Sequence, residues 1–258
     1  MKILFFSHYF PPEGNAPASR TYENCKRWVK NGHKVTVITC VPNSPNGVVY
    51  KGYKNKVYQK ELIDGIEVCR VWTYIAANKG TLLRIVNYLF YMVSASVFSL
   101  FVKKPDVVIA TSPQFFCGWA GVLSKFWHRR PFILEIRDIW PESIITVGAM
   151  KKSFLIRILE YLEKVMYASA NHIVTVGEGY RKCLLKKGVF PESISVVMNG
   201  VNRELFKPKD ADPELKRKLG INNRFICMYS GTIGMACGLN IVLDAEERMK
   251  KQDINDIV

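Results

Sequence analysis

The sequence predicts an α/β fold built on a doubly wound, mostly parallel sheet. Short apolar runs alternate along the chain with longer segments of helical periodicity. The first strand, the first helix and the second strand fit within residues 3–39, and so tight a unit implies a parallel pair with a right-handed crossover. With 258 residues, 48% of them hydrophobic, the chain can bury a core without disulfides or metal.

The first unit begins at the N-terminus. The apolar run KILFFS, bounded by PPEGNAP, is typical of a strand buried on both faces. A helix is expected next, because apolar residues recur at helical spacing and Asn31-Gly32 follows as a stop signal. The second strand is VTVIT, residues 35–39. The apolar positions of that helix are Ala18, Tyr22, Cys25 and Val29.

Later segments repeat this pattern of strand and helix. A broad apolar stripe over 153–168 predicts a helix that packs on the sheet. Five further apolar runs are predicted strands: 65–72, 106–111, 132–136, 172–176 and 195–201.

The composition changes after Val201. A polar stretch contains two prolines and a short helix capped by Asp212, and a new apolar strand is predicted over 225–231, with a helix from about 239 to 250. The predicted domains are 1–203, a connector 204–222, and 223–258 as the beginning of a second α/β domain. One strand and one helix cannot bury both faces of a sheet, so this second domain is expected to be incomplete.

Charge and cysteine content restrict the class of protein. The formal net charge of +15 predicts an anionic partner, such as nucleic acid, a phosphorylated substrate or lipid headgroups, without choosing among them. The seven cysteines are scattered, without zinc spacing, and indicate reduced core residues of a cytosolic protein. No signal-peptide core precedes Pro11-Pro12.

Residues 85–102 carry no charge and lie between Arg84 and Lys103-Lys104. A membrane-spanning helix is disfavoured, because it would place strands of one sheet on opposite sides of the bilayer. A helix packed on the sheet, and one that also dips an apolar side into the membrane interface, both remain open. Tyrosines and lysines alternate over 48–60, as in a headgroup region or a solvated loop. Together these features favour peripheral attachment to the cytoplasmic face of the membrane.

Ligands of open parallel sheets bind beyond the carboxyl ends of the strands, so the loops there carry the candidate chemistry. In the first loop, Gly14 lets a ligand approach the backbone, and the next helix offers free N–H groups to an anion. TSPQFF, residues 111–116, is a polar turn after a buried strand. In EIRDIWPES, residues 135–143, charges cluster at a strand end, where a structural pairing or capping role stays open beside a functional one.

A fourth loop, SGTIGMACGL at 230–239, places small residues between a strand and a helix, as in a diphosphate cradle. No GxGxxG, P-loop, HExxH, GxSxG or kinase motif is present. The sequence therefore disfavours dehydrogenases, P-loop enzymes and the common hydrolases.

Four segments in this order, HYFPPEGNAPASR, RDIWPES, VMNGVN and YSGTIGMACGL, resemble retaining glycosyltransferases of the GT-B fold with a family 4-like N-terminal domain. The nearest subgroup is the bacterial, fucosaminyltransferase-like one that builds O-antigen, capsule and related surface polysaccharides. The resemblance runs through nearly the whole chain. It implies an N-terminal Rossmann-like domain for the acceptor and a C-terminal one for the donor.

The resemblance also implies the reaction, which is transfer of a hexosyl-type sugar from a nucleotide-diphosphate sugar to an acceptor, with retention and without cofactor or essential metal. A polyprenyl-diphosphate-linked saccharide is the expected acceptor, and it would account for the basic charge and the apolar helix. Paired glutamates that grip the donor are expected later in the second domain. We therefore expect this chain alone to be inactive or partial, or to be completed by a separate C-terminal half.

The resemblance assigns roles to residues in all four loops. Asp138 would hydrogen-bond the transferred sugar, and Arg137, which stands where many relatives carry a histidine, is the second catalytic candidate. Many relatives place an arginine and a lysine in the fourth loop, whereas no cation occurs here between Ser230 and Leu243. The donor-binding candidates are Gly14, Gly231, Thr232 and Gly234. The candidates for contact with the acceptor or the sugar are Glu13, Arg20, Ser112 and Glu142.

Two other classes of function remain for comparison. The chain could be a non-catalytic binding or scaffolding half of a split transferase. A nucleic-acid-binding protein would explain the basic charge, but no helix-turn-helix, zinc finger, RRM or KH signature is visible and the basic residues are dispersed. No nucleic-acid partner is therefore expected.

Overall fold

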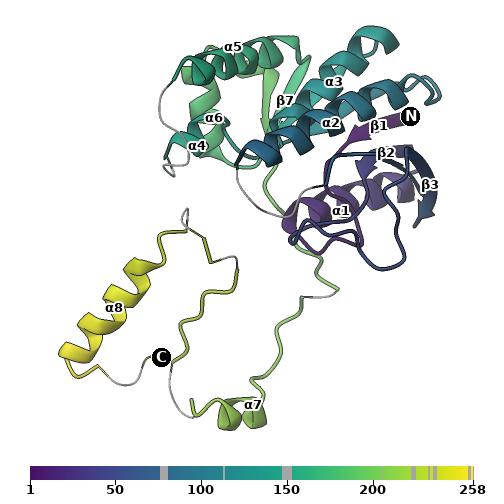
Figure 1. The fold of residues 1–258 in the computed structure, drawn as a ribbon. Helices are drawn as coiled ribbons and strands as arrows, with labels where there is room; N and C mark the ends of the chain where they lie inside the picture. The colour runs from purple at the N-terminus through teal and green to yellow at the C-terminus, as the bar shows by residue number, and fades with distance from the viewer. Residues whose placement is uncertain are drawn as a thin grey trace. The chain divides into compact units, whose positions relative to one another are not determined.

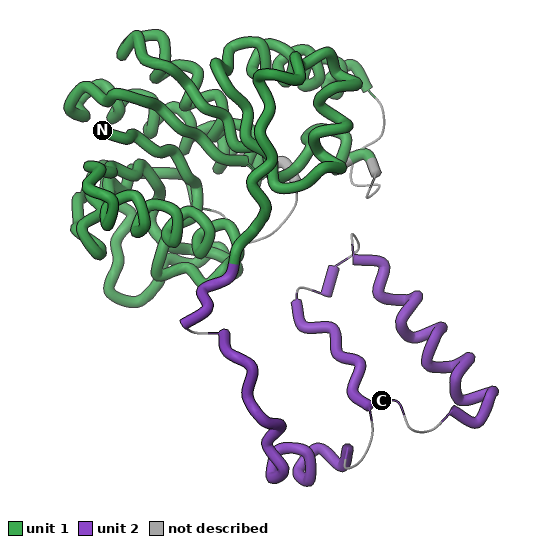
Figure 2. The backbone as a smooth tube through the Cα atoms, turned by 180° about the vertical axis from the view of Figure 1, so that it is seen from behind, with its two compact units in different colours: residues 1–146, 150–200 green, residues 147–149, 201–258 purple. Residues whose placement is uncertain are grey.

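The computed structural model describes residues 1–75, 81–112, 114–146, 153–204, 206–221, 225–231, 233–234, 237–254 and 257. The chain divides into two compact units, coloured separately in Figure 2. Residues 1–146 and 150–200 form the first unit, and residues 147–149 and 201–258 form the second. Each unit is described by itself.

The first unit contains an eight-stranded sheet with the order β3-β4-β2-β1-β5-β6-β7-β8. Figure 1 labels β1, β2, β3 and β7 of this sheet. All neighbouring strands are parallel except β3 and β4. This arrangement confirms the predicted fold class. The strands are β1 (Lys2–Phe6), β2 (Lys34–Cys40), β3 (Tyr58–Ile63), β4 (Ile66–Val71), β5 (Val107–Thr111), β6 (Phe132–Ile136), β7 (His172–Thr175) and β8 (Ile194–Val196).

Helices cover both faces of this sheet, so each face has its own hydrophobic core. One core packs Tyr22, Cys25 and Trp28 of α1 against β1, β2 and β4. The other packs α2, α3, α5 and α6 on the opposite face. The central strands are mostly apolar because both their faces are buried. The helices of this unit are α1 (Ala16–Lys30), α2 (Thr81–Ser99), α3 (Phe115–His128), α4 (Glu142–Thr146), α5 (Phe154–Ser169) and α6 (Glu178–Lys186), with a 3₁₀ turn at Pro191–Ser193.

The edge strand β3 departs from the sequence analysis, which treated 48–60 as one headgroup region or solvated loop. Residues from Tyr58 onward pair antiparallel with β4, and Ile63 lies opposite Ile66. Asp64 and Gly65 form the connecting turn, with φ angles of 47° and 79°. Asp-Gly between two apolar-patterned runs is a strong hairpin signal, and it was the sequence feature that could have predicted β3.

The second unit contains α7 (Pro213–Lys218) and α8 (Asn240–Lys251), close to the predicted helices. Asp212 caps α7 by accepting hydrogen bonds from the amides of Glu214 and Leu215. The strand predicted over 225–231 is wrong for the described residues, because Phe225 forms only an isolated parallel bridge to Ile257. A strand needs a continuous neighbour to bond with, and none of the described segments supplies one.

The uncharged segment forms α2, which packs on the sheet through Tyr91 and Ala95. Tyr91 also donates a hydrogen bond to the carbonyl of Ile38, at 2.8 Å. Among the helices of the described segments, none combines the length and the apolarity that crossing a membrane requires.

Candidate functional site

The candidate site lies at the carboxyl edge of the sheet, around β1, β5 and β6. These three strands are adjacent and parallel, with Phe6 paired to Ala110 and Thr111 paired to Glu135. The chain winds in opposite directions on either side of the β1–β5 boundary, which makes it a topological switch point. The loops that begin at Ser7, Ser112 and Arg137 therefore leave the sheet next to one another.

The loop after β1 is held in place by Glu13. The buried carboxylate of Glu13 accepts hydrogen bonds from the amides of Asn43 at 3.0 Å, Ser44 at 2.8 Å and Phe10 at 3.3 Å. Burial raises the pKa of this carboxyl, and the three amides act in the opposite direction. Glu13 thus ties the loop to the segment after β2, a role within the fold that the sequence did not indicate.

Gly14, the next residue, faces open space. A Cβ atom built there would meet no atom within 4 Å, apart from its chain neighbours. The side chain of Asn15 then caps α1 by accepting a hydrogen bond from the amide of Ala18, at 2.9 Å. The loop therefore presents bare backbone at Gly14, ahead of a helix N-terminus whose Ala18 and Ser19 amides already donate to Asn15. An anionic group at this edge would meet the helix dipole and the amides that precede Pro17.

The guanidinium of Arg20, on α1, donates hydrogen bonds to groups of the protein itself. Its guanidinium bonds one carboxylate oxygen of Glu135, at 2.9 Å from Nε and 2.8 Å from Nη2. It also donates to the carbonyls of Val197 and Met198 and to the side chain of Asn199. Arg20 thus joins α1, β6 and the segment after β8, which ends at the boundary of the first unit. The predicted 195–201 strand stops at Val196, where this segment turns toward Arg20.

Ser112 joins the ends of β5 and β6. Its hydroxyl accepts a hydrogen bond from the amide of Arg137 at 2.8 Å, and its own amide donates to the carbonyl of Glu135 at 2.9 Å. The neighbouring Thr111 donates to the second carboxylate oxygen of Glu135, at 2.6 Å. Glu135 is therefore paired on one side with Arg20 and on the other with Thr111, which fixes the strand ends that carry the candidate residues.

Arg137 and Asp138 follow β6 and are half-buried. Burial lowers the pKa of the Arg137 guanidinium, while the carboxylate of Glu135 opposes that shift and the charge of Arg20 adds to it. Nη1 of Arg137 is buried and has no hydrogen-bond partner within the described structure. Burial likewise raises the pKa of the Asp138 carboxyl, against the hydrogen bond that it accepts from the Ser143 hydroxyl at 3.1 Å.

The rest of the Arg-Asp-Ile-Trp-Pro-Glu loop anchors this pair. Trp140 stacks on Phe115 of α3, with ring centroids 4.7 Å apart. Glu142 lies 3.1 Å from the ammonium of Lys187, which also bonds the buried carboxylate of Glu163 at 2.7 Å. Glu142 therefore takes part in an ion-pair network that joins α4, α5 and the end of α6.

Arg70 is a positioning residue that the sequence analysis did not identify. Its side chain is 1% exposed, pairs with Glu61 of β3, and donates to the carbonyls of Cys40 at 3.0 Å and Pro11 at 2.5 Å. It thus holds the Pro11 end of the Gly14 loop while Glu13 holds the other. An arginine between Cys69 and Val71, within the predicted strand IEVCRV, was the available signal, because a buried cation needs several partners.

The fourth predicted loop belongs to the second unit. Gly231 and Gly234 are exposed there, and the Gly234 carbonyl accepts a hydrogen bond from the amide of Cys237, at 3.0 Å. A Cβ atom at Gly231 would lie 3.0 Å from the hydroxyl of Tyr229. Thr232 lies outside the described residues. The structure thus brings Glu13, Gly14, Arg20, Ser112, Arg137 and Asp138 to one edge of the first unit.

The cysteines and the possible metal ligands offer no second site. Cys25, Cys40, Cys69 and Cys117 are buried and unpaired, as predicted for core residues, whereas Cys227 and Cys237 are exposed. No cluster of three or more His, Cys, Asp or Glu side chains suited to a metal ion occurs among the described residues.

Comparison with known proteins gives consistent matches. Residues 15–200 match the family described as "Glycosyl transferase 4-like domain". The putative colanic acid biosynthesis glycosyl transferase WcaI of Escherichia coli (strain K12) is 27% identical over 264 residues, covering 98% of this chain and 64% of that protein. The probable glycosyltransferase WbjE of Pseudomonas aeruginosa is 24% identical over 152 residues, covering 58% of this chain and 38% of that protein. The chain thus spans under two thirds of the length of these relatives.

Solved structures show the same fold. The crystal structure of Anabaena Alr3699/HepE in complex with UDP-glucose matches with a TM-score of 0.60 and 15% identity, covering 100% of this chain and 59% of that one. The same protein with UDP and glucose matches with a TM-score of 0.61 and 16% identity, covering 96% and 58%. These likenesses confirm the GT-B type of fold that the sequence predicts.

Proposed function

This chain belongs to the family of glycosyl transferase 4-like domains, and we propose that it takes part in transferring a sugar from a nucleotide-diphosphate sugar to a lipid-linked saccharide. The donor class is supported by the complexes of Alr3699/HepE with UDP-glucose and UDP. Bacterial surface polysaccharide is the proposed product, supported by the description of WcaI as a colanic acid biosynthesis enzyme. In its finer parts, the proposal is that the transferred group is a hexosyl group, that the anomeric configuration is retained, and that the protein belongs to the fucosaminyltransferase-like subgroup.

The observation that carries the proposal is the half-buried pair Arg137 and Asp138, which follows β6 at the carboxyl edge of the sheet, one strand from the switch point of a family 4-like domain. The Asp138 carboxylate is suited to accept a hydrogen bond from a hydroxyl of the transferred sugar. The Arg137 guanidinium has a buried Nη1 without a partner in the described structure, and a phosphate oxygen would satisfy it.

The open backbone at Gly14 and the N-terminus of α1 supply the second contact. Pro17 has no N–H, and the amides of Ala18 and Ser19 already donate to Asn15. The helix dipole of α1 and the backbone amides ahead of Pro17 would therefore be the groups that stabilise charge developing on a leaving diphosphate, without reorganisation during the reaction. In the transfer, the bond from the anomeric carbon to the diphosphate breaks and a bond to an acceptor oxygen forms. The acceptor proton leaves with the diphosphate. We propose no metal and no further cofactor for this step.

Peripheral association with the cytoplasmic face of the membrane completes the proposal, with a polyprenyl-diphosphate-linked saccharide as the acceptor. The net charge of +15 supports it, since a lipid phosphate attracts a basic protein surface, and so do the exposed apolar side chains of α2 beyond Arg84. The partners proposed are thus the donor, the lipid-linked acceptor and the membrane surface. A separately encoded C-terminal half is a further proposed partner, and no nucleic acid is proposed.

Substituting Asp138→Asn in the protein that carries this chain tests the assignment. Membranes containing lipid-linked saccharides and radiolabelled UDP-glucose, the first donor to try, measure the transfer. We expect turnover to fall about 10²–10³-fold, because a preorganised contact to the reacting sugar is lost. Asn keeps the shape and an acceptor for Ser143, so the melting temperature should stay near that of the unsubstituted protein.

The control is Glu160→Gln, which removes an exposed carboxylate of α5 that takes part in none of the contacts described at this edge. It should leave turnover unchanged. Unchanged turnover in Asp138→Asn would overturn the assignment of this residue. A protein with no turnover on any nucleotide sugar, but with saturable binding of the acceptor, would instead favour the scaffolding function. The anomeric configuration of the product, read by NMR, tests retention.

A further inference from the structure

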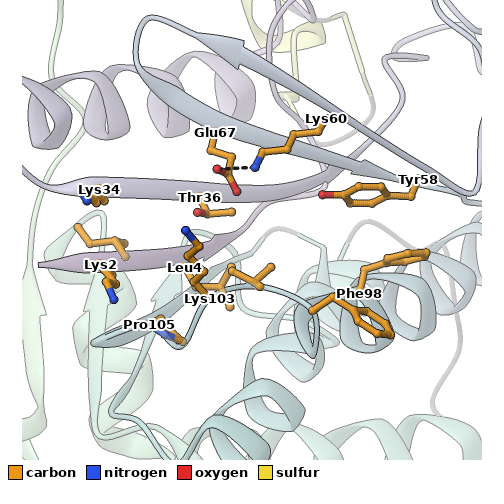
Figure 3. Close-up of a pocket in the computed structure, with 13 residues that line it drawn as sticks. Lys2, Leu4, Lys34, Thr36, Tyr58, Lys60, Glu67, Phe98, Lys103 and Pro105 are labelled. Atoms are coloured by element: carbon orange, nitrogen blue, oxygen red, sulfur yellow. Dashed lines mark ion pairs between the residues drawn. The ribbon is translucent and has the colours of Figure 1, made fainter.

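A second concave surface lies at the opposite, amino-terminal edge of the sheet, outside the candidate transfer site. A pocket of about 510 Å³ opens between the starts of β1 and β2, the hairpin β3–β4 and the end of α2. Figure 3 shows its side chains, with lysines on several sides and aromatic rings at one end. None of the residues proposed for the transfer reaction lines it.

The charge in this pocket is predominantly positive. Lys2, Lys34 and Lys103 line it, and no ion pair joins any of their side chains to another described residue. The fourth lysine, Lys60, is neutralised by Glu67 at 2.7 Å. Asp106, beside the pocket, accepts a hydrogen bond from the backbone amide of Lys2 at 2.7 Å. A small anion bearing oxygen atoms would complement the three remaining ammonium groups.

The wall formed by α2 and β3 is aromatic. Tyr58 stacks on Phe98, with centroids 5.1 Å apart and ring planes 15° apart. Phe101 lines the same end of the pocket, yet 79% of its surface is exposed to solvent. A pocket that combines lysines with exposed aromatic rings fits an amphipathic ligand better than a simple ion.

An exposed apolar stripe leads along α2 to this pocket. The charge-free segment between Arg84 and Lys103 turns a row of large apolar side chains outward, and its last member, Phe101, is also a pocket residue. Monomeric proteins rarely expose so continuous an apolar row unless it has a binding role. We call these residues the α2 stripe: Leu89, Phe90, Val93, Val97, Leu100 and Phe101.

Helix α3 extends the stripe with residues typical of a membrane interface. α2 and α3 lie side by side (Figure 1), and the indole of Trp127 donates to the hydroxyl of Ser99 at 3.0 Å. Phe126, the preceding residue, is exposed, and Arg129 and Arg130 follow after the buried His128. Aromatic residues flanked by cations are the composition found where a protein meets lipid headgroups.

We infer that the pocket binds the phosphate headgroup of an anionic phospholipid, while the α2 stripe lies among the acyl chains of the same membrane. Charge complementarity favours this occupant, because the apolar row carries no acidic residue and basic residues stand at both of its ends. The inference rests on the membrane association in the proposed function and assigns it to one surface. The membrane-contacting surface inferred here differs from the tyrosine- and lysine-rich residues 48–60 expected from the sequence, since only Tyr58 and Lys60 of that segment line the pocket.

Vesicle cosedimentation tests the pocket. The purified protein is mixed with phosphatidylcholine vesicles that contain or lack phosphatidylglycerol. The triple variant Lys2→Gln, Lys34→Gln, Lys103→Gln is compared with a control of equal charge, Lys164→Gln, Lys182→Gln, Lys186→Gln, whose lysines are exposed on α5 and α6. Each lysine near an anionic surface contributes about fivefold to partitioning, so the pocket variant should bind on the order of a hundredfold more weakly. The control should keep most of its binding.

The apolar part has its own matched pair. Phe101→Ser should lower partitioning about tenfold, whereas Phe154→Ser, at a side chain that is 77% exposed on α5, should not. Equal loss in the two lysine variants would mean that only net charge matters and would overturn the pocket. A free-anion site would give a different result: soluble glycerol phosphate would bind saturably and compete with the vesicles, and Phe101→Ser would have no effect. That result would overturn the lipid as the occupant of the pocket.

Failure of this inference can be told apart from failure of the proposed function. If the unsubstituted protein does not bind anionic vesicles at all, both the proposed membrane association and this inference are overturned. If it binds them and all four variants bind equally, the association stands at another surface and the inference is overturned. Transfer of sugar, which the Asp138→Asn experiment measures, is independent of all these outcomes.

Discussion

At the scale of single residues, Gly14 tests whether the carboxyl edge receives a ligand. A side chain fits there without touching the protein, so Gly14→Leu should leave the melting temperature within about 2 °C, because surface substitutions away from special features shift stability by under ~0.5 kcal/mol. If a substrate approaches this backbone, the same change should lower kcat/KM for transfer at least tenfold. Full activity in a folded Gly14→Leu protein would remove Gly14 from the site.

His8 gives a prediction about stability and pH. Its buried ring packs edge-on against Tyr9, Tyr88 and Tyr91, and burial lowers its pKa from 6.5 to about 3. The unfolded chain therefore binds a proton near pH 6.5 that the folded protein binds only near pH 3. The stability associated with neutral His8 is complete above pH 6.5 and is lost as the pH falls toward 3, by about 1.4 kcal/mol per pH unit.

Urea denaturation at pH 7 and pH 5 measures this effect. His8→Gln should remove roughly 2 kcal/mol of the acid-dependent loss between these two values, whatever its own absolute stability. His33→Gln, a substitution at a partly exposed histidine, serves as the matched control and should retain the loss. Identical slopes for His8→Gln and the unsubstituted protein would show that His8 is not held neutral by burial.

Only part of the residue-scale picture could be predicted from the sequence. The Arg137–Asp138 loop and Gly14 stand out because they follow the carboxyl ends of predicted parallel strands, where ligands bind, and because their charges and bare backbone can contact a ligand. Glu13, Arg20 and Ser112 were predicted as contacts to the acceptor or sugar, and the structure shows each bonded to distant backbone or side-chain groups. The local sequence does not indicate such long-range partners, so the roles of Glu13, Arg20 and Ser112 in positioning the loops can be recognised only in the folded structure.

At the scale of elements, the packing of α3 on the sheet gives the sharpest prediction. A Cβ atom at Gly121 would lie 2.5 Å from the ring of Phe132 and 2.7 Å from the Cβ of Ala110. Gly121→Ala should therefore destabilise the protein by about 1–3 kcal/mol, because neither neighbour can move freely. Gly179→Ala, in open space on α6, should instead be neutral or stabilise by up to about 1 kcal/mol.

Thermal unfolding of the two alanine variants measures the difference. Because the expected effects have opposite signs, the melting temperature of Gly121→Ala should lie several degrees below that of Gly179→Ala. Equal melting temperatures would mean that α3 does not pack against β5 and β6 as closely as the structure shows.

Most elements of the first unit follow from the sequence, because strands buried on both faces consist mainly of apolar residues. FILEI predicts β6 with the bounds that the structure has. β3 escaped prediction because one of its faces is exposed and its polar residues resemble a loop. The run FICMYS is apolar enough for a strand. A strand also requires a neighbouring strand to pair with, and the apolar character of a segment does not show whether such a neighbour exists.

At the scale of the whole molecule, the two edges of the sheet carry different chemistry. The carboxyl edge gathers the loops of β1, β5 and β6 around Gly14, Ser112 and Asp138, as parallel pairing requires. The amino-terminal edge gathers Lys2, Lys34 and Lys103, whose side chains form no ion pair with another described residue, beside the exposed apolar side chains of α2. We propose sugar transfer at the first edge and membrane contact at the second.

Photocrosslinking with a polyprenyl-diphosphate-linked saccharide that carries a diazirine on its terminal sugar tests this assignment most directly. Mass spectrometry then locates the modified peptides. The account predicts labelling of residues 8–15, 111–112 and 137–143, which competes with unlabelled acceptor and declines in Gly14→Leu. Competed labelling confined to the peptides that begin β1 and β2, with none at the carboxyl edge, would contradict it.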